Sequence, residues 1–209
     1  AFERNEIKTV FPEINVLELP EEPYGWSKFF SETELFHTPI VTKEDIDRTH
    51  FYQSERKRLD TKKSMTQADY LSSLKLQLTG QVVNDTNLDR VVQLINKTNQ
   101  FNTNGIRVDY EKITNYASSP ECFAWAFSLE DLYSNYGIIS CIYGKVNQES
   151  QIHIDGWVLS CRAFTRNVET AIIQFLANEL KACPEILIHF EETKKNKYAQ
   201  KYFNDAKFH

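Results

Sequence analysis

The sequence predicts a mixed α/β domain, in which helices cover a sheet of parallel and antiparallel strands. The clearest sign is a helix after residue 167, whose apolar positions fall on one face: Val168, Ala171, Ile172, Phe175, Leu176 and Leu180. Strand-like segments lie on both sides of it, at residues 151–159 and 185–190. A strand, a helix and a second strand in this order are typical of helices packed on a sheet.

The other elements follow from the same two periodicities. Leu74, Leu76 and Leu78 alternate with polar residues, which is the pattern of a half-buried strand. Further elements are expected as helices at residues 64–73 and 88–95, strands at 122–129 and 137–143, and a last helix from Asn196. The predicted order from residue 74 is strand, helix, helix, three strands, helix, strand, helix.

The first sixty residues differ from the rest. Three prolines interrupt an acidic segment, and Thr42-x-x-Asp45 then forms a capping box at the start of a charged helix with few apolar positions. We therefore expect residues 1–63 to be an arm and residues 64–209 to form the α/β domain. The chain begins without Met and ends on Phe208-His209, so we expect both ends to be cuts in a longer polypeptide.

Composition excludes several classes of function. The net charge is −5 and no basic block is present, which argues against nucleic acid as a partner. No apolar run approaches the roughly 20 residues that cross a bilayer, so no membrane partner is expected. Four cysteines lack the C-x-x-C pairs of a metal site: Cys122, Cys141, Cys161 and Cys183. They predict reduced thiols in the cytoplasm and no metal.

Four segments carry a resemblance to a known family: QLINKTNQFN at 93–102, LEDLYSNYG at 129–137, SCRAFTRNVE at 160–169 and TKKN at 193–196. With them the chain resembles the C-terminal part of FkbH-like proteins, in which a phosphatase-like domain of the HAD superfamily precedes a GNAT-like acyltransferase domain. The resemblance covers nearly the whole chain. It implies a GNAT-like acyl-CoA N-acyltransferase fold with an N-terminal arm, whose first residues are the tail of the HAD-like domain.

The resemblance also implies a function. An FkbH-like protein would handle an acyl group, such as glyceryl, on coenzyme A or on the phosphopantetheine thiol of an acyl carrier protein, together with its HAD-like phosphatase domain. In a GNAT-like domain, the loop between the fourth strand and the next helix offers amides to a pyrophosphate. The resemblance thus implies that Arg162, Thr165, Arg166 and Asn167 of this loop bind the cofactor. It also implies that the thioester lies between splayed strands near Gly137 and Trp157.

Two departures from the family pattern support an alternative function. Thr165 and Asn167 stand where small residues, usually glycine, let the backbone approach a pyrophosphate. Phe203 stands where a tyrosine acid is common, and phenylalanine has no proton to donate. The alternative is a catalytically silent GNAT-like domain that docks a carrier protein or presents substrate to the HAD-like phosphatase domain.

Cys161 is the candidate catalytic residue. It follows a strand, precedes a helix and has arginines as neighbours, which are features of nucleophilic cysteines, although a small buried hydrophobe explains the same position. Arg162 and Arg166 bind phosphate or form salt bridges with the acidic residues Asp131, Asp155 or Glu169. The candidate substrate-binding residues are Asn99 and Asn102, in a polar loop, and the family position Asn196.

Overall fold

The computed structural model describes residues 2–11, 14, 16–33, 54–55, 58, 61–62, 65–147, 151–180 and 185–206. The chain divides into two compact units, residues 1–41 and 42–209, which are considered separately below. The Thr42–Asp45 capping box lies outside the described residues, as do most of the charged helix after it and Cys183. The domain boundary after residue 63 stays a prediction.

The first unit contains helix α1 (Phe2–Val10), the short 3₁₀ helix η1 (Pro23–Gly25) and helix α2 (Trp26–Glu32). The indole Nε1 of Trp26 donates a hydrogen bond to the carbonyl oxygen of Pro20 at 2.9 Å. None of the described residues of this unit is buried. The described part of the unit therefore has no hydrophobic core of its own.

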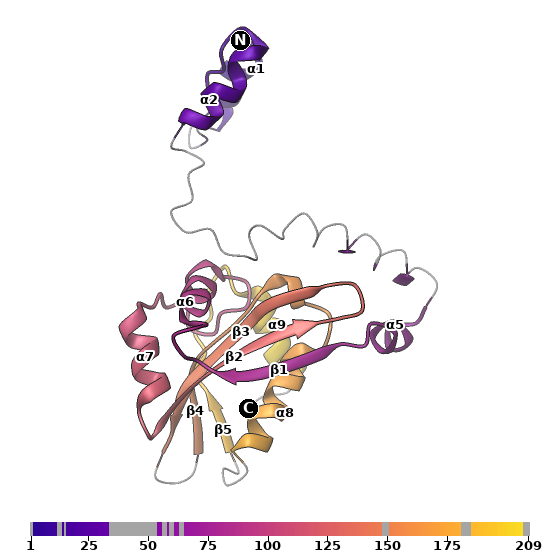
Figure 1. Ribbon diagram of the computed structural model, residues 1–209, viewed down its shortest axis with the longest axis vertical. Helices are drawn as coiled ribbons and strands as arrows, with labels where there is room; N and C mark the ends of the chain where they lie inside the picture. The colour runs from indigo at the N-terminus through magenta and orange to yellow at the C-terminus, as the bar shows by residue number, and fades with distance from the viewer. Residues whose placement is uncertain are drawn as a thin grey trace. The chain divides into compact units, whose positions relative to one another are not determined.

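The second unit is built on one five-stranded sheet (Figure 1). Its strands are β1 (Gln77–Val82), β2 (Cys122–Glu130), β3 (Asn135–Val146), β4 (Gln151–Leu159) and β5 (Glu185–Ile188), and their spatial order follows the chain. The first four strands pair antiparallel, whereas β4 and β5 pair parallel. A parallel pair needs a long crossover connection, which is usually a helix. The predicted mixed α/β sheet is confirmed.

The helices of this unit are α5 (Gln67–Ser73), α6 (Leu88–Lys97), α7 (Tyr110–Ser118), η3 (Cys161–Ala163), α8 (Val168–Glu179) and α9 (Lys197–Asp205). The predicted order of strands and helices is confirmed. The first strand begins later than the leucine alternation indicated. Leu74 instead caps α5 and is fully buried, and Lys75 turns the chain with a φ of 50°.

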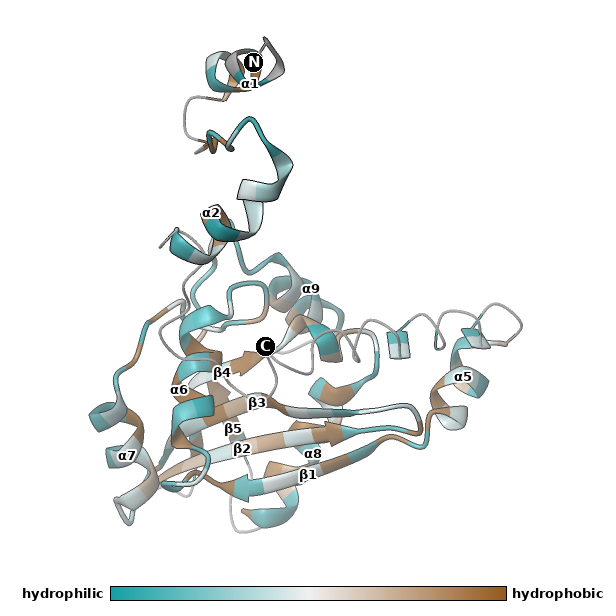
Figure 2. Ribbon diagram, turned by 45° about the horizontal axis from the view of Figure 1, so that its top comes forward, coloured by the Kyte–Doolittle hydropathy of each residue, from teal (hydrophilic) through white to brown (hydrophobic). Residues whose placement is uncertain are grey.

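Each face of the sheet has its own hydrophobic core. Helices α8 and α9 contribute Ile172, Leu176 and Phe203 to the core on one face, and α6 and α7 contribute Val91 and Ile113 to the core on the other. Figure 2 shows hydrophobic residues along the strands and mixed hydrophilic and hydrophobic residues along the helices. This is the arrangement of a sheet covered by amphipathic helices on both sides.

Gly144 is fixed by a close approach of two strands. It lies beside a register shift between β3 and β4, where an added Cβ atom would overlap the carbonyl oxygen of His153. We expect Gly144→Ala to lower the free energy of unfolding by about 3 kcal/mol, because the paired backbones must separate. Urea unfolding measures the loss.

Gly80→Ala is the matched control for this prediction. Its added methyl group would meet the ring of Phe175, a half-buried side chain that can rotate away. The loss of stability should therefore be smaller than for Gly144→Ala. Equal losses in the two variants would show that the close approach of β3 and β4 is not what restricts Gly144.

Candidate active site

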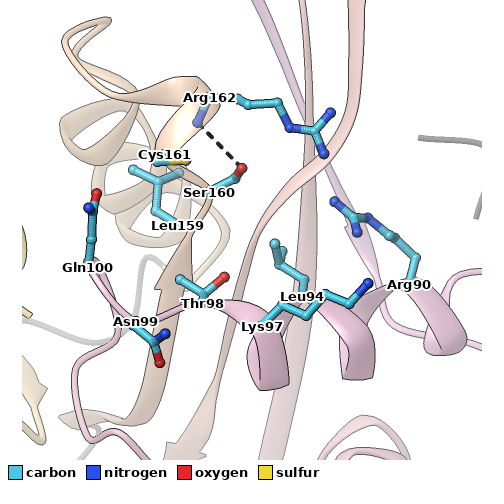
Figure 3. A pocket seen from close by; sticks show the side chains of 10 residues that line it. All are labelled: Arg90, Leu94, Lys97, Thr98, Asn99, Gln100, Leu159, Ser160, Cys161 and Arg162. Atoms are coloured by element: carbon cyan, nitrogen blue, oxygen red, sulfur yellow. Dashed lines mark hydrogen bonds between the residues drawn. The ribbon is translucent and has the colours of Figure 1, made fainter. Parts of the chain in front are cut away.

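A cavity of about 340 Å³ lies where β4 ends, between the last turn of α6 and the loop that follows β4. We call it the Cys161 pocket (Figure 3). Three of the side chains that line it are cationic: Arg90, Lys97 and Arg162. None of its described lining residues is acidic. Such a pocket attracts anions, and it stabilises negative charge that develops on a substrate during a reaction.

The end of β4 places the thiol at this pocket. Ser160 caps η3, and its Oγ accepts a hydrogen bond from the amide of Arg162 at 3.4 Å. Cys161 is the first residue of η3 and is exposed. Cys141 provides the contrast, because it is fully buried in the sheet and burial raises the pKa of its thiol. Of these two thiols, only Cys161 is accessible to a substrate.

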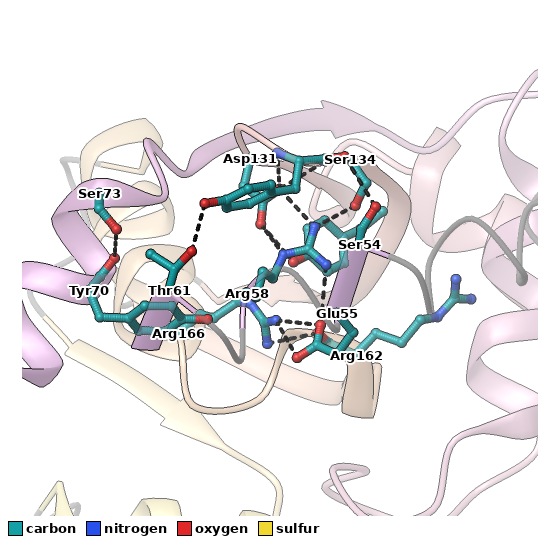
Figure 4. Close-up of polar contacts among 12 residues, drawn as sticks. Ser54, Glu55, Arg58, Thr61, Tyr70, Ser73, Asp131, Ser134, Arg162 and Arg166 are labelled. Atoms are coloured by element: carbon teal, nitrogen blue, oxygen red, sulfur yellow. Dashed lines mark hydrogen bonds and ion pairs between the residues drawn. The ribbon is translucent and has the colours of Figure 1, made fainter. Parts of the chain in front are cut away.

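The side chains of Arg162, from the loop after β4, and Arg90, from α6, extend toward one another at one end of the pocket (Figure 3). The side chain of Arg162 extends away from Glu55 (Figure 4). The two Nη atoms of Arg90 donate hydrogen bonds to Gln93 Oε1 at 2.6 Å and to the carbonyl oxygen of Ile138 at 3.2 Å. These bonds fix the Arg90 cation between α6 and β3, so the positive charge of the pocket is held in place.

Arg166 has a different environment from Arg162. Its Nη1 donates to the carbonyl oxygens of Arg162 and Phe164, at 3.1 and 3.0 Å, and its Nη2 pairs with Glu55 at 3.1 Å. The ion-pair partner of Arg166 is thus Glu55. It is not Asp131, Asp155 or Glu169, which the sequence suggested. Asp131 instead pairs with Arg58, and Asp155 accepts a hydrogen bond from Tyr116. Arg166 therefore stabilises the loop after β4 by donating hydrogen bonds to two carbonyl oxygens of that loop.

Thr165 and Asn167 lie at a second cavity of about 420 Å³, between the start of α8 and helix α9. Their φ angles are 67° and 56°, the left-handed region that favours glycine. The loop thus has the backbone conformation of a glycine-rich turn but carries side chains there. Asn167 is the N-cap residue of α8, although its side chain makes no capping bond.

The residues around this second cavity do not fit a pyrophosphate group. Glu169 lies in the first turn of α8 and is only 3% exposed. Burial raises the pKa of its carboxyl group, while hydrogen bonds from its own amide and from Tyr198 act to lower it. The Tyr198 hydroxyl also accepts from the amide of Thr165 at 3.1 Å. The chain's own carboxyl group thus occupies the helix start at which an anion would bind.

The three candidate asparagines have different positions. Asn99 lines the Cys161 pocket, and its Oδ1 accepts from Arg107 at 2.8 Å. Asn102 is buried, and its Nδ2 donates to the carbonyl oxygen of Thr98 at 3.2 Å. Asn196 is buried as well, and its Nδ2 donates to the carbonyl oxygens of Asn102 and Glu191, at 3.0 and 2.8 Å. Of the three, only Asn99 lines the same pocket as Cys161.

The structure therefore brings three predicted site residues together, Cys161, Arg162 and Asn99. Sequence reasoning missed Arg90 and Lys97, the other two cations of the pocket. Both lie in α6, seven residues apart, so they share a helix face. That spacing was the available signal, but an exposed helix face has the same pattern.

No protein-family model matches this chain, and no curated protein sequence is similar to it. In the part of the chain that the structure describes, no helix is long and apolar enough to cross a membrane. Likewise, no three His, Cys, Asp or Glu side chains of the described residues gather as metal ligands would.

Several solved structures are similar in part. Aminoglycoside 6'-N-acetyltransferases from Acinetobacter haemolyticus and Acinetobacter baumannii are 11% and 9% identical, over 63% and 64% of this chain and 90% and 91% of theirs, with TM-scores of 0.47 and 0.48. A ribosomal-protein-alanine N-acetyltransferase from Brucella melitensis biovar Abortus 2308 is 7% identical, over 62% of this chain and 90% of that one, with a TM-score of 0.47. Similarity at this level carries no argument about activity.

Proposed function

We propose that this chain is an acyl-handling domain of GNAT-like architecture, in which Cys161 accepts an acyl group from a thioester and passes it to a second thiol. One observation carries the proposal. An exposed thiol lies at a pocket that is lined by three cationic side chains and, among its described residues, by no acid. This is the environment in which cysteine nucleophiles are found.

The proposed reaction is a thioester exchange. The Cys161 thiol gives its proton to solvent, and its Sγ attacks the carbonyl carbon of the thioester. The guanidinium groups of Arg162 and Arg90 stabilise the negative charge that develops in the pocket. The bond from the carbonyl carbon to the donor sulfur then breaks, and the donor leaves as a thiolate that takes up a proton. Attack by an acceptor thiol reverses these steps and restores Cys161.

The resemblance to FkbH-like proteins supports a finer version of this proposal. The acyl group is then glyceryl or a related small acid, and the second thiol belongs to the phosphopantetheine arm of an acyl carrier protein in the cytoplasm. The acyl group reaches this domain from the HAD-like phosphatase domain of the full-length chain. The roles of Arg166, Thr165, Asn167, Asn102 and Asn196 in ligand binding stay predictions.

Labelling of the purified chain with an acetyl thioester of N-acetylcysteamine tests the proposal. Mass spectrometry of the intact chain and of its peptides should find one acetyl group on Cys161, and Cys161→Ala should lose it. Cys122→Ala is the matched control, because Cys122 is half-buried and lies outside the Cys161 pocket. An adduct that persists in Cys161→Ala at the wild-type rate would contradict the assignment.

A second candidate function is the silent domain that docks a carrier protein. It is favoured by Phe203, which packs edge-on against Phe190 with ring centroids 5.1 Å apart and offers no hydroxyl group. Calorimetry with a phosphopantetheinylated carrier protein separates the two functions. Carrier binding without any acyl adduct on Cys161 would favour the silent domain.

A further inference from the structure

The pairing of β4 with β5 ends early. The two strands are in register from Gln151 to Ile154 only, opposite Glu185 to Ile188. Strand β4 then continues to Leu159, while β5 has already ended. The sheet therefore leaves a slot beside the last five residues of β4. The resemblance implies a thioester between splayed strands near Gly137 and Trp157, and Trp157 lies in the part of β4 that borders this slot. Gly137 does not border it, because it pairs with Leu129 on the opposite side of β3.

The chain itself fills this slot with residues 100–104, which we call the slot segment. The amide of Thr103 donates to the carbonyl oxygen of Trp157 at 3.0 Å, and the amide of Trp157 donates to Thr103 Oγ1 at 3.0 Å. The amide of Leu159 donates to the carbonyl oxygen of Phe101 at 3.0 Å. These bonds, with a bridge between Asn102 and Val158, make the segment a short antiparallel strand on β4.

The other side of the slot segment is bonded as well. The amide of Glu191, just after β5, donates to the carbonyl oxygen of Thr103 at 2.7 Å. The buried Asn196 donates to the carbonyl oxygen of Asn102 at 3.0 Å. The slot segment therefore spans the gap between β4 and the chain beyond β5, and it uses the backbone groups that an inserted thioester arm would need.

Aromatic packing holds the slot segment in the core. Phe101 is fully buried, and its ring centroid lies 4.8 Å from that of Trp157, 5.8 Å from that of Tyr202 and 6.1 Å from that of Phe203. Asn102, which follows Phe101, is buried too. A segment with this burial and this bonding is part of the folded core, and local opening of such a segment is costly.

We infer that the slot segment replaces the thioester arm in this fold, so that the chain does not bind coenzyme A or acyl-CoA between β4 and β5. The start of α8 agrees with this inference, because the buried Glu169 carboxyl group and the Tyr198 hydroxyl, which accepts from the amide of Thr165, lie at the loop to which the resemblance assigns the pyrophosphate. The inference goes beyond the proposed role of Cys161 and does not depend on it. It restricts thioester substrates to the solvent-open side of the Cys161 pocket.

Two measurements on the purified chain test the closed slot. Calorimetry with CoA and acetyl-CoA should show no saturable binding tighter than about 1 mM. Hydrogen exchange without ligand should show slow exchange at the amides of Thr103 and Leu159, both bonded inside the slot. Fast exchange at these amides would overturn the inference, and so would CoA binding that changes their exchange. CoA binding that leaves them unchanged would place CoA elsewhere and agree with a closed slot.

Glu169→Gln separates the slot segment from the buried carboxyl group. The variant removes the negative charge at the start of α8 and leaves residues 100–104 in place. We expect it to remain unable to bind CoA. If CoA binding appears in this variant, the charge of Glu169 excludes CoA from the wild-type chain, and the slot segment does not. Both readouts are binding or exchange, so their failure is distinct from a failure to acylate Cys161.

Discussion

Arg58→Met is expected to lower the free energy of unfolding by about 3–5 kcal/mol. The side chain of Arg58 is fully buried, and its Nε and Nη2 donate to the two carboxylate oxygens of Asp131 at 2.7 and 2.8 Å. Methionine fills a similar volume but leaves a buried carboxylate without its cation. Denaturant unfolding of wild type and variant measures the loss.

The pH dependence of this loss identifies its cause. Burial acts to raise the pKa of Asp131, but hydrogen bonds from Arg58, from the amides of Tyr133 and Ser134 and from the Tyr136 hydroxyl outweigh it and lower the pKa. Stability from a lowered carboxyl pKa is present above the unfolded pKa of about 3.9 and is lost as pH falls through the folded pKa. The difference between wild type and Arg58→Met should shrink over that range.

Lys201→Met is the control for the loss of an ion pair as such. Lys201 pairs with Asp205 at 3.5 Å on α9, and both side chains are mostly exposed. Exposed pairs of this kind contribute less than about 0.5 kcal/mol. If Arg58→Met were no less stable than Lys201→Met, the buried pair would not stabilise the fold.

The Arg58–Asp131 ion pair also supports the loop that contains Cys161. Glu55 accepts from Arg58 at 3.2 Å and from Arg166 at 3.1 Å, so it connects the Arg58–Asp131 pair to the loop after β4 (Figure 4). The guanidinium groups of both arginines also lie over the ring of Tyr136, at 4.8 and 5.3 Å from its centroid. A described part of the expected arm thus takes part in the structure of the second unit.

Local periodicity explains what the sequence predicted well. The predicted strand at residues 151–159 matches β4, and the helix predicted from Val168 begins at that residue as α8. In both elements the pattern of apolar residues is a property of neighbouring positions, so the sequence alone contains it. The predicted combination of Cys161 with Arg162 is also local, because both residues lie in η3.

Long-range pairing explains what the sequence did not predict. Arg58 lies in a segment rich in charges, which predicted a charged helix in an arm, but its partner Asp131 is 73 positions away. Asn102 lies in a polar loop that was expected to be exposed, yet its backbone pairs with Val158 and it is buried. In both cases a contact between distant segments reverses the exposure that the residue types suggest.

Phe101→Ala is the second large effect we expect, a loss of about 3–5 kcal/mol in the free energy of unfolding. The ring of Phe101 is fully buried against Trp157, Tyr202 and Phe203, so its removal leaves a cavity in the core on the α8–α9 face. Phe190→Ala is the matched control, because Phe190 is only half-buried and packs on the same core. Its loss of stability should be smaller.

The same variant connects the stability of the core to the closed slot. Phe101 is the only large apolar side chain of residues 100–104, so its loss weakens the packing of the whole slot segment. Hydrogen exchange at the amides of Thr103 and Leu159 should become faster in Phe101→Ala than in Phe190→Ala, measured under conditions where both variants stay folded. Equal exchange in the two variants would mean that backbone bonds alone hold the segment on β4. Faster exchange in Phe101→Ala would show that core packing keeps the slot closed.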